Sequence, residues 1–149
     1  MSRGLSCGVV LIASVFVVAS VSSQPTEPAE AVTPKAPKAD EPVSFQNHIA
    51  GILQVRCGSC HIEESRGRIN FASFEKLTER GGMIRVSRPE RSALVKSVRS
   101  GSMPPKEKMP EAEIEAIRRW VTEGAKFDGP SRTAILSTYS GIAPDVKKP

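Results

Sequence analysis

The amino-acid sequence predicts an all-α fold for the part of the chain that forms a core. Four segments place apolar residues at helical spacing, and each is bordered by residues that begin or end helices. No segment shows the alternation of apolar and polar residues that is typical of a half-buried strand. The 149 residues are 39% hydrophobic, which fits one small domain with additional segments. Aromatic residues make up only 5% of the chain, so a bound cofactor would complete a thin core.

The first predicted helix begins after Ser44, whose hydroxyl can accept a hydrogen bond from an unpaired N–H of the first turn. The helix runs into Cys57. Its Phe45, Ile49, Ile52, Leu53 and Arg56 side chains are expected to share one face of the helix. His48 lies beside this face, and we expect it to be solvated.

The second and third predicted helices are shorter. Ser73 begins the second, with Phe74 and Leu77 inward, and the glycines at 81 and 82 end it. Pro89 suits the first position of the third helix, because its fixed φ favours the helical conformation. Leu94, Val95 and Val98 are the apolar residues of this helix, and Gly101 follows its end.

The fourth helix has the clearest pattern. Glutamates at its start favour the positive end of the helix dipole, and Gly124 ends it. The glutamates are Glu111, Glu113 and Glu115, and the buried stripe is Ile114, Ile117, Trp120 and Val121.

The first 23 residues resemble a signal peptide, which predicts export to the periplasm or an equivalent compartment. Arg3 gives a cationic start, residues 5–21 are mostly apolar, and small residues precede a cleavage site before Gln24. Cys7 would be lost with this segment. The alternative is an uncleaved membrane anchor, because the apolar run approaches the length that spans a bilayer.

The rest of the chain divides into three parts. Residues 24–42 contain five prolines and mixed charges, a composition that predicts an extended linker. Residues 43–130 carry the four helices and form the predicted domain. Residues 131–149 form a C-terminal extension to which the sequence assigns no role.

Residues 57–61 read Cys-Gly-Ser-Cys-His, the signature for covalent attachment of haem c. Positions i, i+3 and i+4 lie on one side of a helical turn, so both thiols can reach one edge of a porphyrin while His61 faces its iron. A redox-active disulfide is the first alternative, but it usually accompanies a βαβ pattern. A zinc site is the second, and it would need further ligands, whereas the only other histidine is His48.

Met103 is the candidate for the second iron ligand. Two prolines follow it and stiffen the loop, and a methionine and histidine pair raises the reduction potential of a haem iron. One alternative is that Met103 only packs against the porphyrin ring and does not bind the iron. Ligation by Met109 or Met83 is another.

Residues 43–128 resemble the class I cytochrome c family, most closely its small planctomycete-type domain. Three stretches carry the resemblance: the helix that runs into Cys57–His61, the helix start at residues 88–94, and Met103-Pro-Pro followed by residues 113–125. The resemblance implies about four helices around one haem, with His61 and Met103 as axial ligands and the first and last helices packed across each other. Pro110 replaces the usual Ser or Thr helix cap, and Arg85 and Arg88 flank a turn that usually has small residues.

These features predict a one-electron carrier rather than an enzyme. No catalytic residue is predicted, because no cluster of His, Arg and Trp suited to cleaving a peroxide is visible. A haem-based sensor or a peroxidase-like protein with a labile sixth ligand is the alternative function.

Protein redox partners are expected, and an acidic partner would suit the charge of the chain. Residues 80–108 hold eight Lys or Arg and only two Glu, which would steer such a partner, although an ordinary solvated surface is the alternative. Nucleic acid is excluded as a partner because the basic residues are not interleaved with aromatic ones. Membrane association is expected only through an uncleaved N-terminus.

Overall fold

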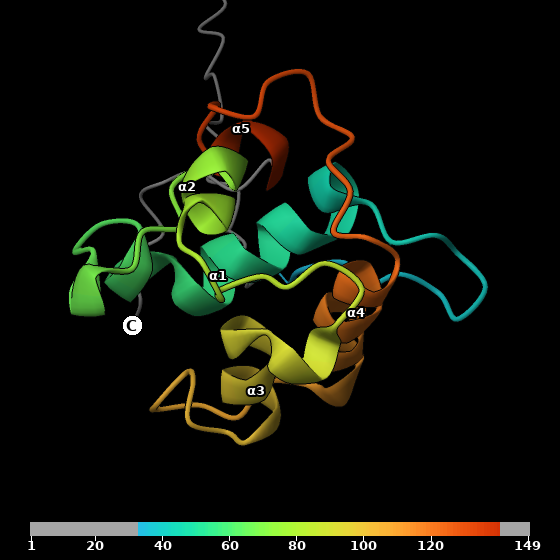
Figure 1. Cartoon of the computed structure of the whole chain (residues 1–149), viewed down its shortest axis with the longest axis horizontal. Coiled ribbons are helices and arrows are strands. Elements are labelled where there is room, and N and C mark those ends of the chain that lie inside the picture. The colour runs from blue at the N-terminus through green and yellow to red at the C-terminus, as the bar shows by residue number, and fades with distance from the viewer. Residues whose placement is uncertain (1–32, 141–149) are drawn as a thin grey trace, which may run out of the picture. The chain divides into compact units, whose positions relative to one another are not determined.

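Helix α1 (Ala50–His61) runs through the middle of the fold, with other helices above and below it (Figure 1). The computed structural model describes residues 33–140. Helices and turns make up this part of the chain, and its residues form no β-strand, so the prediction of an all-α fold is confirmed. The predicted signal peptide, the first part of the predicted linker and residues 141–149 lie outside the described residues. No helix within residues 33–140 is long and apolar enough to cross a membrane.

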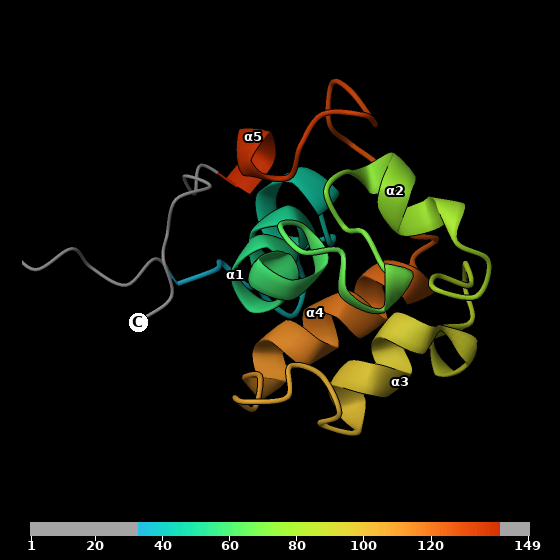
Figure 2. The same ribbon diagram turned by 90° about the vertical axis from the view of Figure 1, so that its left-hand side faces the viewer.

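The elements around α1 form two groups. In both views α2 and α5 lie above α1, while α3 and α4 lie side by side below it (Figures 1 and 2). In chain order the elements are the π-helical turn η1 (Phe45–Ile49), α1, the 3₁₀ turn η2 (Arg66–Arg68), α2 (Phe74–Glu79), the 3₁₀ turn η3 (Pro89–Arg91), α3 (Ala93–Arg99), α4 (Glu111–Thr122) and α5 (Ser137–Ser140).

The helix caps read from the sequence are confirmed. The Ser44 hydroxyl accepts a hydrogen bond from the N–H of Asn47 at 2.9 Å, and Ser73 accepts one from Lys76 at 3.2 Å. Helix α4 begins at Glu111, directly after Pro110. Gly124 ends it with a φ of +106°, a conformation that costs a glycine little.

The third predicted helix differs from its prediction. Pro89 begins only the short turn η3, and α3 starts four residues later at Ala93. Ser92 separates the two, because its backbone is extended and its side chain is occupied by the preceding turn. The Ser92 hydroxyl is buried, accepts a hydrogen bond from the N–H of Arg85 at 2.8 Å and donates to the carbonyl oxygen of Arg88 at 3.2 Å.

An aromatic cluster forms the part of the core between η1, α2 and α4. The ring of Phe45 lies edge-on to that of Phe74, with 4.9 Å between centroids, and 5.7 Å from that of Trp120. The Trp120 indole donates to the carbonyl oxygen of Lys126 at 2.9 Å. Phe127 and Tyr139 complete the cluster. The few aromatic residues are thus concentrated in one place, which offsets their small number.

The folded part extends past both boundaries that we predicted for the domain. Arg119 of α4 donates to the carbonyl oxygens of Lys38 and Glu41 at 2.9 and 2.6 Å, so this end of the predicted linker lies against α4. At the other end, Leu136 is 1% exposed, and its N–H donates to the carbonyl oxygen of Ala72 at 3.0 Å. Residues 38–41 and 131–140 therefore belong to the folded domain.

The prediction of a solvated His48 is wrong. Its side chain is 1% exposed, because residues 38–43 cover it on the outside of η1. The imidazole approaches Glu41 of this covering segment, with 3.4 Å between Nε2 and the nearer carboxylate oxygen.

Candidate functional site

The last turn of α1 carries Cys57, Cys60 and His61. The helix includes the whole motif, and the next N–H, that of Ile62, still donates to the carbonyl oxygen of Gly58 at 2.8 Å. The spacing of three and four residues therefore places both thiols and the imidazole on one side of the helix. Cys57 is buried, while Cys60 and His61 are half-buried.

A cavity of about 380 Å³ lies between this turn and the loop that follows α3. Cys57, Cys60 and His61 line it from α1, and Met103 lines it from the loop. Its other lining residues are Arg56, Ser59, Glu64, Arg66, Pro104, Pro105 and Lys106. The structure thus brings the four predicted site residues to one space whose volume is within the range of ligand pockets.

A hydrogen bond orients the His61 ring. Its Nδ1 atom lies 3.2 Å from the carbonyl oxygen of Arg66, and a carbonyl oxygen can only accept, so Nδ1 carries the proton. In the neutral ring, the Nε2 atom then has the lone pair. This arrangement is typical of histidines that bind a metal, because the second hydrogen bond fixes both the tautomer and the direction of the ring.

Both cysteines are free thiols. Burial raises the pKa of the Cys57 thiol to about 12, and the neighbouring Cys60 and Glu113 add to the shift. A redox-active Cys-x-x-C site and a zinc site both need a thiolate, which is formed most readily where the pKa is lowered. The burial of Cys57 therefore argues against a redox-active disulfide, and the lack of a group of three or more metal-binding side chains within residues 33–140 argues against zinc.

Met103 differs from the other described methionines in its surroundings. Its side chain is 41% exposed and lines the cavity of Cys57, Cys60 and His61. Met109 and Met83 are 4% and 7% exposed and belong to the core. The backbone N–H of Met103 donates to the carbonyl oxygen of Ser97 at 3.2 Å, which joins the loop to α3. Of the three methionines within residues 33–140, only Met103 lines this cavity.

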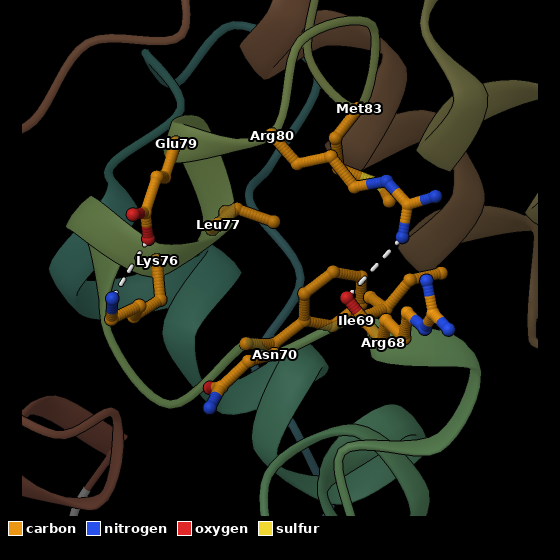
Figure 3. Close-up of a pocket in the computed structure, with 9 residues that line it drawn as sticks. Arg68, Ile69, Asn70, Lys76, Leu77, Glu79, Arg80 and Met83 are labelled. Atoms are coloured by element: carbon orange, nitrogen blue, oxygen red, sulfur yellow. Dashed lines mark hydrogen bonds and ion pairs between the residues drawn. The ribbon is translucent and has the colours of Figure 1, made fainter.

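A second cavity, of about 300 Å³, lies between α2 and the segment that follows η2 (Figure 3). Ile69, Phe71, Leu77 and Met83 give it apolar walls. Phe71 lines this second cavity, and its ring centroid lies 5.2 Å from that of His61, which lines the first.

Two arginines stand at the rim of this second cavity. Arg80 reaches across it and donates to the carbonyl oxygens of Gly67 and Arg68 at 3.3 and 3.2 Å (Figure 3). The side chain of Arg68 is also among the lining groups. Arg85 and Arg88, which flank the turn noted in the sequence, do not line this cavity. Arg68 and Arg80 lie in polar stretches without a motif, so only the folded arrangement distinguishes them.

A buried ion pair joins α1 to α4 beside Cys57. Arg56 donates to both carboxylate oxygens of Glu113, at 2.8 and 2.9 Å, and its third nitrogen donates to Glu107 at 3.0 Å. The hydrogen bonds to Glu113 raise the pKa of Arg56 above its usual value. Arg56 and Glu113 were not predicted as a pair, because their contact depends on how the two helices cross.

The donor atoms at the first cavity fit a haem c. Two free thiols at the required spacing, an imidazole with a free Nε2 and a thioether from another segment are the groups that such a haem uses. Within residues 33–140, no group of three or more His, Cys, Asp and Glu side chains could hold a metal ion by itself. Comparisons of the chain with protein-family models, with curated proteins and with solved structures found no match.

Proposed function

We propose that this chain is a monohaem c-type cytochrome that carries single electrons between protein partners. The observation that best supports the proposal is the shared cavity of Cys57, Cys60, His61 and Met103. Its fold would then be a small class I cytochrome c fold wrapped around the haem. The two thiols would hold the group covalently, and His61 and Met103 would be its iron ligands.

When bound, a haem supplies a one-electron couple between ferric and ferrous iron. The chain contributes the environment of that couple. The hydrogen bond to Arg66 keeps the His61 ring in one orientation, and the Met103 thioether favours the ferrous state and thus a higher potential. Arg68 and Arg80 line the second cavity, and they are our candidates for pairing with the two carboxylates of the porphyrin.

The proposed carrier is exported, with residues 1–23 removed as a signal peptide, and works in the periplasm or an equivalent compartment. Its partners are redox proteins. Lys106 lies at the cavity of the motif and forms no ion pair within residues 33–140, and an exposed cation there favours an acidic partner.

The experiment is production of the full chain with haem-maturation machinery, followed by visible absorption and intact mass. We expect the mass of one added haem and a spectrum that shows two strong-field ligands. A chain without added mass, or haem that acidified organic solvent extracts, would contradict the proposal. Rapid binding of carbon monoxide by the ferrous protein would favour the sensor or peroxidase-like alternative instead.

Two variants make this experiment specific. Cys57→Ala with Cys60→Ala removes both thiols and should abolish covalent attachment. Ser59→Ala changes the residue between them, which lines the same cavity but offers no bond to the porphyrin. It should retain one haem.

A further inference from the structure

The loop that carries Met103 has few ties to the rest of the fold. Residues 101–108 are mostly exposed, and open space lies on both sides: the cavity of about 380 Å³ at Cys57 and another of about 610 Å³ toward α3 and α4. The hydrogen bond from Met103 to Ser97 joins the start of the loop to α3, and the buried Met109 fixes its end. A segment with so few contacts opens at low cost in free energy.

One side-chain contact crosses from this loop to the helix that carries the motif. Among the described residues, the only hydrogen bond between residues 104–108 and the rest of the chain is the one from Arg56 to Glu107, at 3.0 Å. Lys106 and Lys108, on either side of Glu107, form no ion pair within residues 33–140. The ion pair between Arg56 and Glu107 is therefore the contact that can hold the loop against α1.

The Arg56 end of this contact is rigid. Its side chain is 14% exposed, and the two hydrogen bonds to Glu113 of α4 fix the plane of the guanidinium group. The third guanidinium nitrogen, Nη1, faces the loop and donates to Glu107, whose side chain is 58% exposed. A fixed cation on α1 thus meets a carboxylate on a movable loop.

We propose that Arg56 is a positioning residue that holds the Met103 loop over the haem cavity through Glu107. The inference rests on the proposed function, because Arg56 would act by keeping the Met103 thioether bound to the haem iron. Loss of the Glu107 carboxylate leaves Met103 in place most of the time but lets the loop open more often. A partly exposed ion pair of this kind shifts such an equilibrium by about twofold to fivefold.

The test measures how often Met103 leaves the iron. Imidazole is added in excess to the ferric full-length holoprotein, and the rate of its binding is followed by absorption, since loop opening limits that rate. We expect Glu107→Ala to bind imidazole about twofold to fivefold faster than the wild type. High salt should bring the wild type close to the variant, because exposed charges are screened.

Glu111→Ala is the matched control. Glu111 lies next to the same loop and also carries one negative charge, but it forms no ion pair within the described residues. Its rate should equal that of the wild type. Equal rates for Glu107→Ala and the wild type, or the same increase in both variants, would overturn the role of Arg56.

A near-infrared spectrum of the ferric wild type separates this result from a failure of the proposed function. A thioether-to-iron band shows that Met103 is bound, so unchanged imidazole rates then count against Arg56 alone. A wild type without that band contradicts the proposed ligand itself. Hydrogen exchange of the peptide that spans residues 101–108 reports the loop directly, and Glu107→Ala should accelerate it in the holoprotein.

Discussion

The Nδ1 atom of His48 accepts a hydrogen bond from the backbone N–H of Ser44 at 3.1 Å, one helical turn away. Nδ1 is therefore unprotonated, and the proton of the neutral ring sits on Nε2, which approaches Glu41. Protonation of Nδ1 would break the bond to Ser44. Because the ring is also buried, the folded chain holds His48 in its neutral form.

This environment predicts that stability falls in mild acid. Burial lowers the pKa of His48 below 6.5, Lys35 lowers it further, and Glu41 and Asp128 oppose the shift. The unfolded chain binds a proton at this histidine near pH 6.5, whereas the folded chain binds it only at lower pH. The contribution of His48 to the free energy of unfolding is therefore fully present above pH 6.5 and decreases as pH falls below it. The loss is at most about 1.4 kcal/mol per pH unit for one proton. Urea unfolding at pH 7.5, 6.5 and 5.5 measures it.

His48→Gln is the control for this pH dependence. The variant keeps a polar side chain but has no group that titrates in this range, so the slope between pH 6.5 and 5.5 should become smaller. Measurements stay above pH 5 because Glu41 titrates lower, where a hydrogen bond from the N–H of Lys38 lowers its pKa. An unchanged slope in His48→Gln would assign the effect to other groups.

Leu136→Ala tests whether the C-terminal segment belongs to the core. The side chain is 1% exposed, so we expect the free energy of unfolding to fall by about 2–4 kcal/mol. Ile135→Ala is the matched control, since the adjacent side chain is 55% exposed and should change stability by less than about 0.5 kcal/mol. Similar values for the two variants would mean that residues 131–140 do not pack as described.

Glu113→Ala should be strongly destabilising. It leaves the Arg56 guanidinium without its two best hydrogen bonds in a largely buried position, which costs about 3 kcal/mol. Glu115→Ala, on the same helix, breaks an exposed pair with Arg118 and should cost less than about 1 kcal/mol. Chemical denaturation of the two variants compares them. The ordering would be wrong if Glu115→Ala lost as much stability as Glu113→Ala.

Met103→Ala and Met109→Ala should separate ligation from packing. Under the proposed function, Met103→Ala loses the near-infrared thioether band and lowers the reduction potential, since sulfur favours ferrous iron. Met109→Ala should keep both properties and instead lose about 2–4 kcal/mol of stability, because Met109 is 4% exposed. The reverse pattern would assign the ligand to Met109.

Local signals predicted the start and end of several helices. Ser44 and Ser73 cap their helices through their own hydroxyls, and Gly124 ends α4 through its positive φ, so each acts within a few residues of sequence. The relative positions of the side chains from Cys57 to His61 likewise depend only on the geometry of about one helical turn. The candidate site could be predicted from the sequence for the same reason.

Other features depend on contacts that are distant in sequence. The interruption at Ser92 follows from bonds to the preceding turn, and the burial of His48 follows from a segment whose prolines suggested only a linker. Arg56 finds Glu113 only once the two helices have crossed. Such contacts leave no periodic pattern in the sequence, which is why the short helix α5 and the arginines of the second cavity were also missed.

The burial of Cys57 sets an order of events for the living cell. In the folded chain this thiol is 7% exposed and burial raises its pKa, so it is a poorer nucleophile than an exposed thiol. Attachment of the proposed cofactor must therefore precede closure of the fold. Under the proposed function, a chain that folded first would enclose this thiol, so the porphyrin would have to be attached before α4 packs against α1.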